Sequence, residues 1–197
     1  MNRTEIIQRL ADKVNAKKYL EIGIGNGKNF NDINCEYKVS VEPFPVVSVT
    51  HTKTSDDFFA QNNEMFDIVF IDGLHWSEQV YLDINNSLFV LNDGGYIVCH
   101  DMSPNNEFIQ LYPNQDINSE WTGDCWKAWV KLRRERDDLL MFVVDTDYGC
   151  GVITRGTQEK LVDNDELTWK NLEMNREKWL KLVSVAEFNI LYDGSRY

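Results

Sequence analysis

Acidic and histidine side chains stand at the ends of short apolar segments in this chain. The residues that share this placement are Glu21, Glu42, Asp72, His75, His100 and Asp101. Carboxylates bind cations and accept protons, and an unperturbed imidazole exchanges a proton near neutral pH. If the fold gathers these groups, their chemistry is proton transfer, cation binding or both.

Three glycines follow Glu21 at every second position, in the segment Tyr19-Leu-Glu-Ile-Gly-Ile-Gly-Asn-Gly27. A backbone without Cβ atoms can turn tightly and approach a ligand closely. The dinucleotide pattern G-x-G-x-x-G requires a glycine where Lys28 stands, and Glu21 would repel a pyrophosphate. The segment therefore favours a cationic, nucleotide-like ligand, and a turn that binds no ligand is the alternative.

Apolar strands that alternate with helices must position these groups. We expect strands at 18–24, 38–42, 46–50, 66–71 and 96–99. We expect a first helix that begins at Asn2 or Thr4 and a second that begins within Thr54-Ser-Asp-Asp57. A third should have Ser77 as its cap and bury residues up to Leu91. Continuous apolar strands separated by helices indicate a parallel sheet with both faces covered, which binds ligands at the carboxyl ends of its strands. The acids and histidines should therefore line one edge.

The C-terminal half predicts a different end to the sheet. A polar loop at 102–123 is expected to be a substrate-side lid rather than an inert connection, and Asp124 begins a helix whose tryptophans face the core. Strands at 139–144 and 150–154 form a hairpin through 145–149. The tail from 158 shows no strand signal, a helix around 167–183 and a capping box at Ser184-Val-Ala-Glu187.

We therefore predict an α/β fold, Rossmann-like and doubly wound. Its mostly parallel, seven-stranded sheet ends in an antiparallel hairpin and is followed by a helical C-terminal tail. Residues 1–156 form the core, and residues 157–197 form a helical extension packed on the same domain.

Composition narrows the partners. The chain has 197 residues, 43% of them hydrophobic, and a net charge of -12, which disfavours nucleic acid and anionic membrane surfaces. Its four cysteines form no C-x-x-C pair, and no run reaches the roughly 18 apolar residues of a membrane span. A cytoplasmic, reducing environment is expected, and the aromatic-rich C-terminal half leaves room for a homo-oligomer.

The ordered motifs resemble those of class I S-adenosylmethionine-dependent methyltransferases. The segments that carry the resemblance are Tyr19–Gly27, Val41-Glu-Pro43, Phe70-Ile-Asp-Gly-Leu-His75 and Gly94-Gly-Tyr-Ile-Val-Cys-His-Asp101. It covers roughly residues 15 to 155. The Asp-Gly-x-His and Gly-Gly…His-Asp signatures are similar to the branch of macrocin-type sugar O-methyltransferases and cephalosporin hydroxylase-like proteins.

The resemblance implies that S-adenosylmethionine is the cofactor. Its methionine end would contact Glu21, Asp72 and the backbone at Gly23, Gly25 and Gly27. Glu42, which lies 19 residues after Gly23 (42 − 23), would accept hydrogen bonds from the ribose. Ser55 and Asp56 stand where that family often contacts adenine, although helix capping explains them equally well.

Two catalytic arrangements stay open. The resemblance implies a divalent metal held by Asp72, His100 and Asp101; Mg²⁺ prefers oxygen ligands, whereas the histidine favours a softer ion. Without a metal, His75 or His100 could be the general base, with Asp72 beside them. The structural alternatives are that His75 caps the next helix and that His100 makes a structural hydrogen bond.

The implied activity is O-methylation of a small or sugar-like hydroxylated substrate, with Trp76 and Trp121 as candidate pocket walls. A metal-dependent hydroxylase or oxidase on the same fold is one alternative. A non-catalytic cofactor-binding module is another, because fold alone never establishes function.

Overall fold

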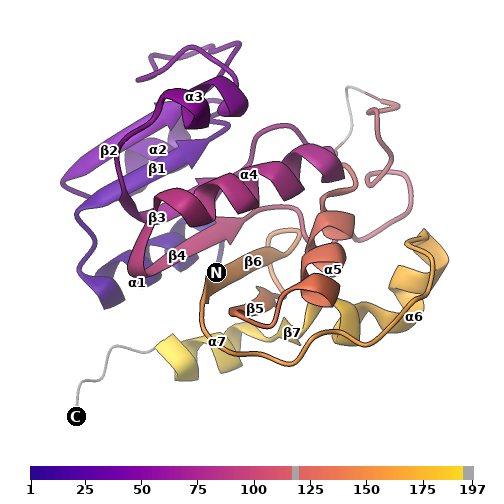
Figure 1. Cartoon of the computed structure of the whole chain (residues 1–197). Helices are drawn as coiled ribbons and strands as arrows, with labels where there is room; N and C mark the ends of the chain where they lie inside the picture. Colours follow the sequence, from indigo (N-terminus) through magenta and orange to yellow (C-terminus); the bar gives the residue numbers. More distant parts are fainter. Residues whose placement is uncertain (117–119, 193–197) are drawn as a thin grey trace.

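The computed structural model describes residues 1–116 and 120–192 (Figure 1). Seven strands form one sheet in the order β2-β1-β3-β4-β6-β5-β7. Their bounds are β1 Lys18–Ile22, β2 Tyr37–Val41, β3 Phe66–Ile71, β4 Leu91–Cys99, β5 Leu139–Val144, β6 Cys150–Arg155 and β7 Leu182–Val183. The strands β1 to β4 pair in parallel, and β6 is antiparallel to both β4 and β5. The predicted fold class and its antiparallel hairpin are confirmed.

Helices cover both faces of this sheet (Figure 1). Their bounds are α1 Arg3–Val14, α2 Lys28–Asp32, α3 Ser55–Gln61, α4 Ser77–Val90, α5 Cys125–Glu135, α6 Trp169–Leu180 and α7 Val185–Tyr192. Successive strand residues point to opposite faces, so Leu20 and Val69 pack with α3, α4, α5 and α6, whereas Tyr19 and Phe70 pack with α1 and α7. Both faces are covered, which explains why the strands read as continuous apolar runs.

The strand register brings four strand ends to the same level. Val41 lies opposite Ile22, Ile22 opposite Ile71, and Ile71 opposite Cys99. The backbone continues this pairing by one residue: Asp72 N donates to Ile22 O at 2.8 Å, and His100 N donates to Ile71 O at 3.0 Å. The residues that follow these strands therefore begin from one edge of the sheet.

The first helix also starts at this edge. Asn2 is its N-cap, and its side chain accepts a hydrogen bond from Glu5 N while the Glu5 side chain accepts one from Asn2 N. This capping box decides the predicted choice between Asn2 and Thr4. Because α1 leads directly into β1, which runs back toward the same edge, its first residue, Arg3, lies beside the strand ends.

The predicted third strand at 46–50 is wrong. Within that stretch and its neighbours, the structure has only a single bridge, between Val41 and His51. Side chains replace the backbone ladder here: Thr50 N donates to Ser40 Oγ at 2.9 Å, and Ser40 N donates toward Thr50 Oγ1 at 3.2 Å. Val46 is 81% exposed, so no apolar face of this segment is available for a sheet. The seventh strand is instead β7, in a tail for which no strand was predicted; it pairs with β5.

Two boundaries of α4 also differ from the prediction. Trp76, not Ser77, is its N-cap and makes no side-chain capping bond; Asp124 accepts hydrogen bonds from both N and Oγ of Ser77 instead. The helix ends at Val90, and Leu91 already belongs to β4, which passes through Gly94 at φ 78°. A short helix, α2, follows the glycines where only an Asn-rich connection was expected.

The C-terminal elements pack against the rest of the described chain. Trp126 and Trp179 stack with ring centroids 6.0 Å apart, and Phe188 of α7 is fully buried. Glu187 accepts hydrogen bonds from N and Oγ of Ser184, which confirms the predicted capping box. Residues 193–197 of the predicted extension, and 117–119 of the predicted lid, lie outside the described residues. No helix in the described ranges is long and apolar enough to cross a membrane.

Candidate active site

A pocket of about 670 Å³ opens at the carboxyl edge of the sheet. The start of α1, the glycine turn, the ends of β3 and β4, the segment 120–122 and the β5–β6 hairpin all contribute to it. The predicted site residues that line it are Glu21, Gly23, Gly25, Asp72, His75, His100, Asp101 and Trp121. The fold therefore brings most of the predicted constellation into one cavity.

The glycines at 23 and 25 serve different purposes. Gly23 has φ 80°, and a Cβ built on it would lie 2.2 Å from the carbonyl oxygen of Asp72. It is required for close approach of β1 to the end of β3. Gly25 has φ 49°, lines the pocket, and has no atom within 4 Å of a built Cβ, so its free side faces open space where a ligand can approach the backbone.

Glu21 lies almost entirely buried on the pocket floor. Its Oε2 accepts hydrogen bonds from Tyr19 Oη at 2.5 Å and from Asn29 Nδ2 at 2.9 Å. Burial raises the pKa of Glu21 to about 7, because these hydrogen bonds only partly offset the loss of solvent. A cationic ligand would favour its charged form.

Carboxylates and imidazoles form a compact cluster beside it. Asp72 Oδ1 lies 3.3 Å from His75 Nε2 and 3.3 Å from His100 Nδ1. Asp101 Oδ1 lies 3.0 Å from His100 Nδ1, and its Oδ2 lies 3.3 Å from His75 Nδ1. Burial disfavours the charged form of Asp72, but the positive imidazoles outweigh it and lower the pKa of this carboxyl. Asp72 and Asp101 thus face both histidines.

His100 is a buried imidazole with free ring nitrogens. Its exposed fraction is 4%, and neither nitrogen forms a hydrogen bond to any described residue, although both lie within ion-pair distance of carboxylates. The structural role considered for it, a satisfied hydrogen bond, is therefore not observed. Burial opposes protonation, but Asp72 and Asp101 outweigh it and raise the pKa of His100.

The segment 121–124 holds His75 in place. His75 Nδ1 lies 3.1 Å from the carbonyl oxygen of Trp121, and the two rings stack at 5.0 Å. Gly123 has φ 59°, and a Cβ on it would lie 1.8 Å from the carbonyl oxygen of His75. Because Trp76 occupies the N-cap of α4, His75 does not cap that helix. Its side chain is directed instead to Asp72 and Asp101.

Two site residues were not anticipated, Arg3 and Asp147. Arg3 Nη1 donates to Asp72 Oδ2 at 2.8 Å, and its Nε donates to Asp147 Oδ2 at 3.0 Å. Arg3 was missed because it precedes the first strand, yet a helix that runs back along a strand starts at that strand's carboxyl edge. Asp147 lies three residues after the predicted strand at 139–144, within the predicted hairpin, so the placement rule that selected Asp72 would have selected Asp145 before it.

Four predicted cofactor residues lie outside the pocket lining: Gly27, Glu42, Ser55 and Asp56. Glu42 is adjacent to the glycine turn, where its Oε2 accepts a long hydrogen bond from Ile24 N at 3.4 Å. Ser55 and Asp56 both accept from Gln79 Nε2, at 3.3 and 3.0 Å. Gly27, at φ 77°, is the N-cap of α2. Trp76, one of the two candidate walls, instead stacks on Tyr112 at 5.7 Å.

The donor set at the cluster fits a metal ion. Ligand atoms of Asp72, His75 and Asp101 lie within 4.8 Å of one another, and His100 Nδ1 approaches two of these carboxylates. An imidazole nitrogen that is buried without a hydrogen bond is a suitable ligand beside two carboxylates.

Comparison with known proteins shows what part of the chain is similar to. Residues 20–102 match a family described as a methyltransferase domain. This segment is therefore similar to a methyltransferase domain. The matched segment runs from β1 to just past β4 and contains both the glycine turn and the strand-end acids.

Solved structures share the fold of this chain. An O-methyltransferase from Bacillus cereus in complex with SAH is 14% identical, with a TM-score of 0.55 over 78% of this chain and 80% of that one. The O-methyltransferase TomG from Streptomyces achromogenes, in complex with SAM, is 14% identical, with a TM-score of 0.58 over 79% and 80%. No curated protein matches the sequence.

Proposed function

We propose that this protein transfers a methyl group from S-adenosylmethionine to a hydroxyl of a small or sugar-like substrate. The observation that carries the proposal is one pocket that joins the glycine turn to the cluster of Asp72, His75, His100 and Asp101. A methyl donor bound on the turn would therefore lie beside groups that can activate an acceptor. The Asp-Gly-x-His and Gly-Gly…His-Asp signatures support a hydroxyl acceptor, because they resemble those of the branch of macrocin-type sugar O-methyltransferases and cephalosporin hydroxylase-like proteins.

The glycine turn suits the methionine end of the cofactor. S-adenosylmethionine carries a sulfonium and an ammonium, and the buried carboxyl group of Glu21 lines the same pocket as the glycine turn. Gly23 and Gly25 bring backbone to the same wall, and Glu42 is close enough to the turn for the predicted contact with the ribose. The solved relatives bound to SAM and SAH support this choice of cofactor.

His75 is the proposed general base. The carbonyl oxygen of Trp121 can only accept a hydrogen bond, so His75 Nδ1 carries the hydrogen. Nε2, which lies 3.3 Å from Asp72 Oδ1, would take the proton of a substrate hydroxyl, and the Asp72 carboxylate would stabilise the imidazolium that forms. The stacked Trp121 ring and the close packing of Gly123 restrict the imidazole to this orientation. Most of the remaining rate enhancement would come from holding the two reactants in line.

A divalent cation fits the same cluster, with Asp72, His100 and Asp101 as its proposed ligands. Such an ion would polarise the acceptor hydroxyl and ease loss of its proton. Two carboxylates suit Mg²⁺, whereas the His100 nitrogen extends the choice to softer ions such as Mn²⁺ or Co²⁺.

Calorimetry with S-adenosylmethionine, S-adenosylhomocysteine and NAD tests the proposed cofactor. We expect the first two to bind and NAD not to bind, because Lys28 replaces the third dinucleotide glycine and Glu21 repels a pyrophosphate. Binding of NAD without binding of S-adenosylhomocysteine would show that the proposed cofactor is wrong.

The affinity for S-adenosylmethionine should rise with pH up to about 7, the pKa of Glu21. The ionised carboxylate attracts the cationic ligand, so affinity should fall by up to about tenfold for each pH unit below that value. The free energy of unfolding of the unliganded protein should change in the opposite direction. As pH rises from 4.5 to about 7, Glu21 should lower this free energy, because burial in the folded protein favours the neutral acid. Glu21→Gln should remove both dependences. If the affinity and the stability of Glu21→Gln kept the pH dependences of the wild type, a group other than Glu21 would be responsible for them.

A further inference from the structure

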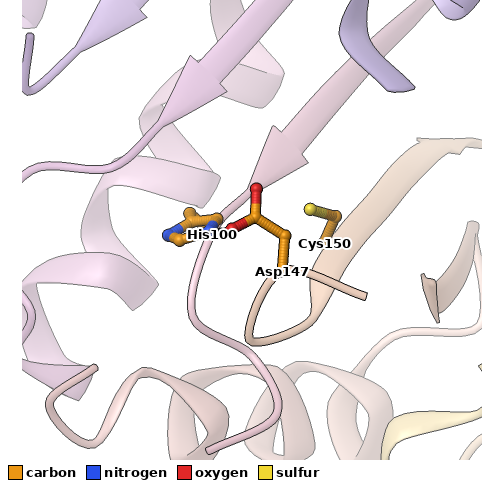
Figure 2. Close-up of side chains that lie close together, drawn as sticks. All are labelled: His100, Asp147 and Cys150. Atoms are coloured by element: carbon orange, nitrogen blue, oxygen red, sulfur yellow. Dashed lines mark ion pairs between the residues drawn. The ribbon is translucent and has the colours of Figure 1, made fainter. Parts of the chain in front are cut away.

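Asp147 adds a third carboxylate to the cluster, on the far side of His100. Its Oδ1 lies 3.5 Å from His100 Nε2, whereas His100 Nδ1 faces Asp72 and Asp101 on the opposite side of the ring. Figure 2 shows the Asp147 carboxylate directed at the imidazole of His100, with Cys150 on the other side of Asp147. Carboxylates therefore lie beside both nitrogens of the imidazole. The exposed fraction of His100 is only 4%.

Arg3 fixes the position of Asp147. Asp147 Oδ2 accepts hydrogen bonds from the backbone N of Arg3 at 2.9 Å and from its Nε at 3.0 Å. Asp147 Oδ1 accepts one from Arg3 Nη2 at 3.1 Å. Both oxygens are therefore held by Arg3, and Oδ1 is the one that also faces His100 Nε2, at 3.5 Å. The start of α1 therefore sets the orientation of a carboxylate on the β5–β6 hairpin.

The hairpin holds Asp147 in a conformation that side chains rarely adopt. Asp147 has φ 50°, and Tyr148 has φ 57°. The hairpin is tied to the segment after His100 because Met102 N donates to Gly149 O at 3.0 Å and Ser103 N donates to Tyr148 O at 2.7 Å. Non-glycine residues rarely adopt this region, and those that do cluster at functional sites. The arrangement is therefore a built contact between the hairpin and the end of β4.

Asp147 could itself bind a metal together with His100 and Cys150, since their ligand atoms lie within 4.8 Å of one another. Arg3 argues against this, because its three hydrogen bonds occupy both carboxylate oxygens of Asp147. At Asp72 it contacts only Oδ2, which leaves Oδ1 of Asp72 available to a cation. A carboxylate on the outer nitrogen of a histidine ligand instead sets the orientation of the ring.

We propose that Asp147 is a positioning residue that holds His100 with Nδ1 directed at Asp72 and Asp101, ready to bind a divalent cation. This inference rests on the metal site of the proposed function and adds the residue that orients its nitrogen ligand. Asp147 itself does not touch the cation.

Calorimetric titration with Co²⁺ tests the role of Asp147. We expect Asp147→Asn to weaken Co²⁺ binding about 10- to 100-fold, the effect typical of losing an outer partner of a histidine ligand. Asp145→Asn is the matched control, because Asp145 is an exposed acid on the same hairpin. The affinity of this variant for Co²⁺ should equal that of the wild type. Equal affinities in all three proteins would overturn the proposal. If Asp147→Asn does not fold, Asp147→Glu replaces it, with a smaller loss expected because the charge is kept.

The absorption spectrum of the Co²⁺ complex separates the two assignments. Ligation by Asp72, His100 and Asp101 predicts no sulfur-to-metal charge-transfer band. A band that disappears in Cys150→Ser would show a centre at Asp147 and Cys150 and would overturn the positioning role.

If the wild type binds no Co²⁺, the proposed metal site is refuted. The contact between Asp147 and His100 can then still be tested by nitrogen NMR. In the metal-free protein, Asp147 should protect the His100 Nε2 hydrogen from exchange. We expect its signal, assigned with His100→Gln, in the wild type and in Asp145→Asn but not in Asp147→Asn. Persistence of the signal in Asp147→Asn would overturn the positioning role.

Discussion

Replacing Asp72 or His75 with alanine should abolish measurable methyl transfer and leave the affinity for S-adenosylhomocysteine largely unchanged. His75 Nε2 is the proposed proton acceptor, and loss of a general base costs about 100- to 10,000-fold in rate. Asp72 contacts His75, His100 and Arg3, so its loss removes the negative charge shared by three groups. Neither change removes Gly23, Gly25 or Glu21, which also line the pocket.

The measurement is release of S-adenosylhomocysteine from S-adenosylmethionine with a panel of hydroxylated small molecules, beside calorimetry of each variant. Asp145→Asn serves as the control for activity, because its side chain is exposed. A large loss of affinity in Asp72→Ala, with an unchanged melting temperature, would assign Asp72 to cofactor binding. Wild-type activity in His75→Ala would transfer the role of base to another group.

Gly23→Ala should destabilise the fold by about 2 to 5 kcal/mol, the sum of overpacking and a left-handed backbone conformation for a residue with a Cβ. The new Cβ would lie 2.2 Å from Asp72 O and 2.4 Å from Gly73 Cα, and both are backbone atoms that cannot rotate away. Relief of the clash would push the end of β3 from β1 and move Asp72. We expect a lower midpoint in urea unfolding together with loss of activity.

Gly25→Ala is the matched comparison. It also has a positive φ, but a Cβ there meets nothing within 4 Å, so the expected cost is only the backbone penalty of about 1 to 2 kcal/mol. Its methyl group would project into open space at the pocket wall and weaken binding of S-adenosylmethionine. Equal destabilisation by the two substitutions would contradict the close approach at Gly23, and unchanged cofactor affinity in Gly25→Ala would place the ligand elsewhere.

Several features could be read from local patterns because neighbouring residues decide them. The apolar runs, the Asn2 capping box and the hairpin at 145–149 depend on contacts within a few residues. The predicted strand at 46–50 failed because a β-ladder needs a long-range partner; here Ser40 and Thr50 bond through their side chains instead. β7 was missed for the converse reason, since two residues become a strand only when β5 lies beside them.

By itself, the sequence determined that the glycine turn, Asp72, His75, His100 and Asp101 lie along one edge, because parallel strands all end there. Only the tertiary structure decided which groups meet across that edge. Helix α1 brings Arg3 from the first residues, and the β5–β6 hairpin brings Asp147 from 144 positions later. Pairing between residues so far apart depends on how helices and strands pack, which no local spacing encodes. The same packing leaves His100 buried between acids, with Nδ1 facing Asp72 and Asp101 and Nε2 facing Asp147.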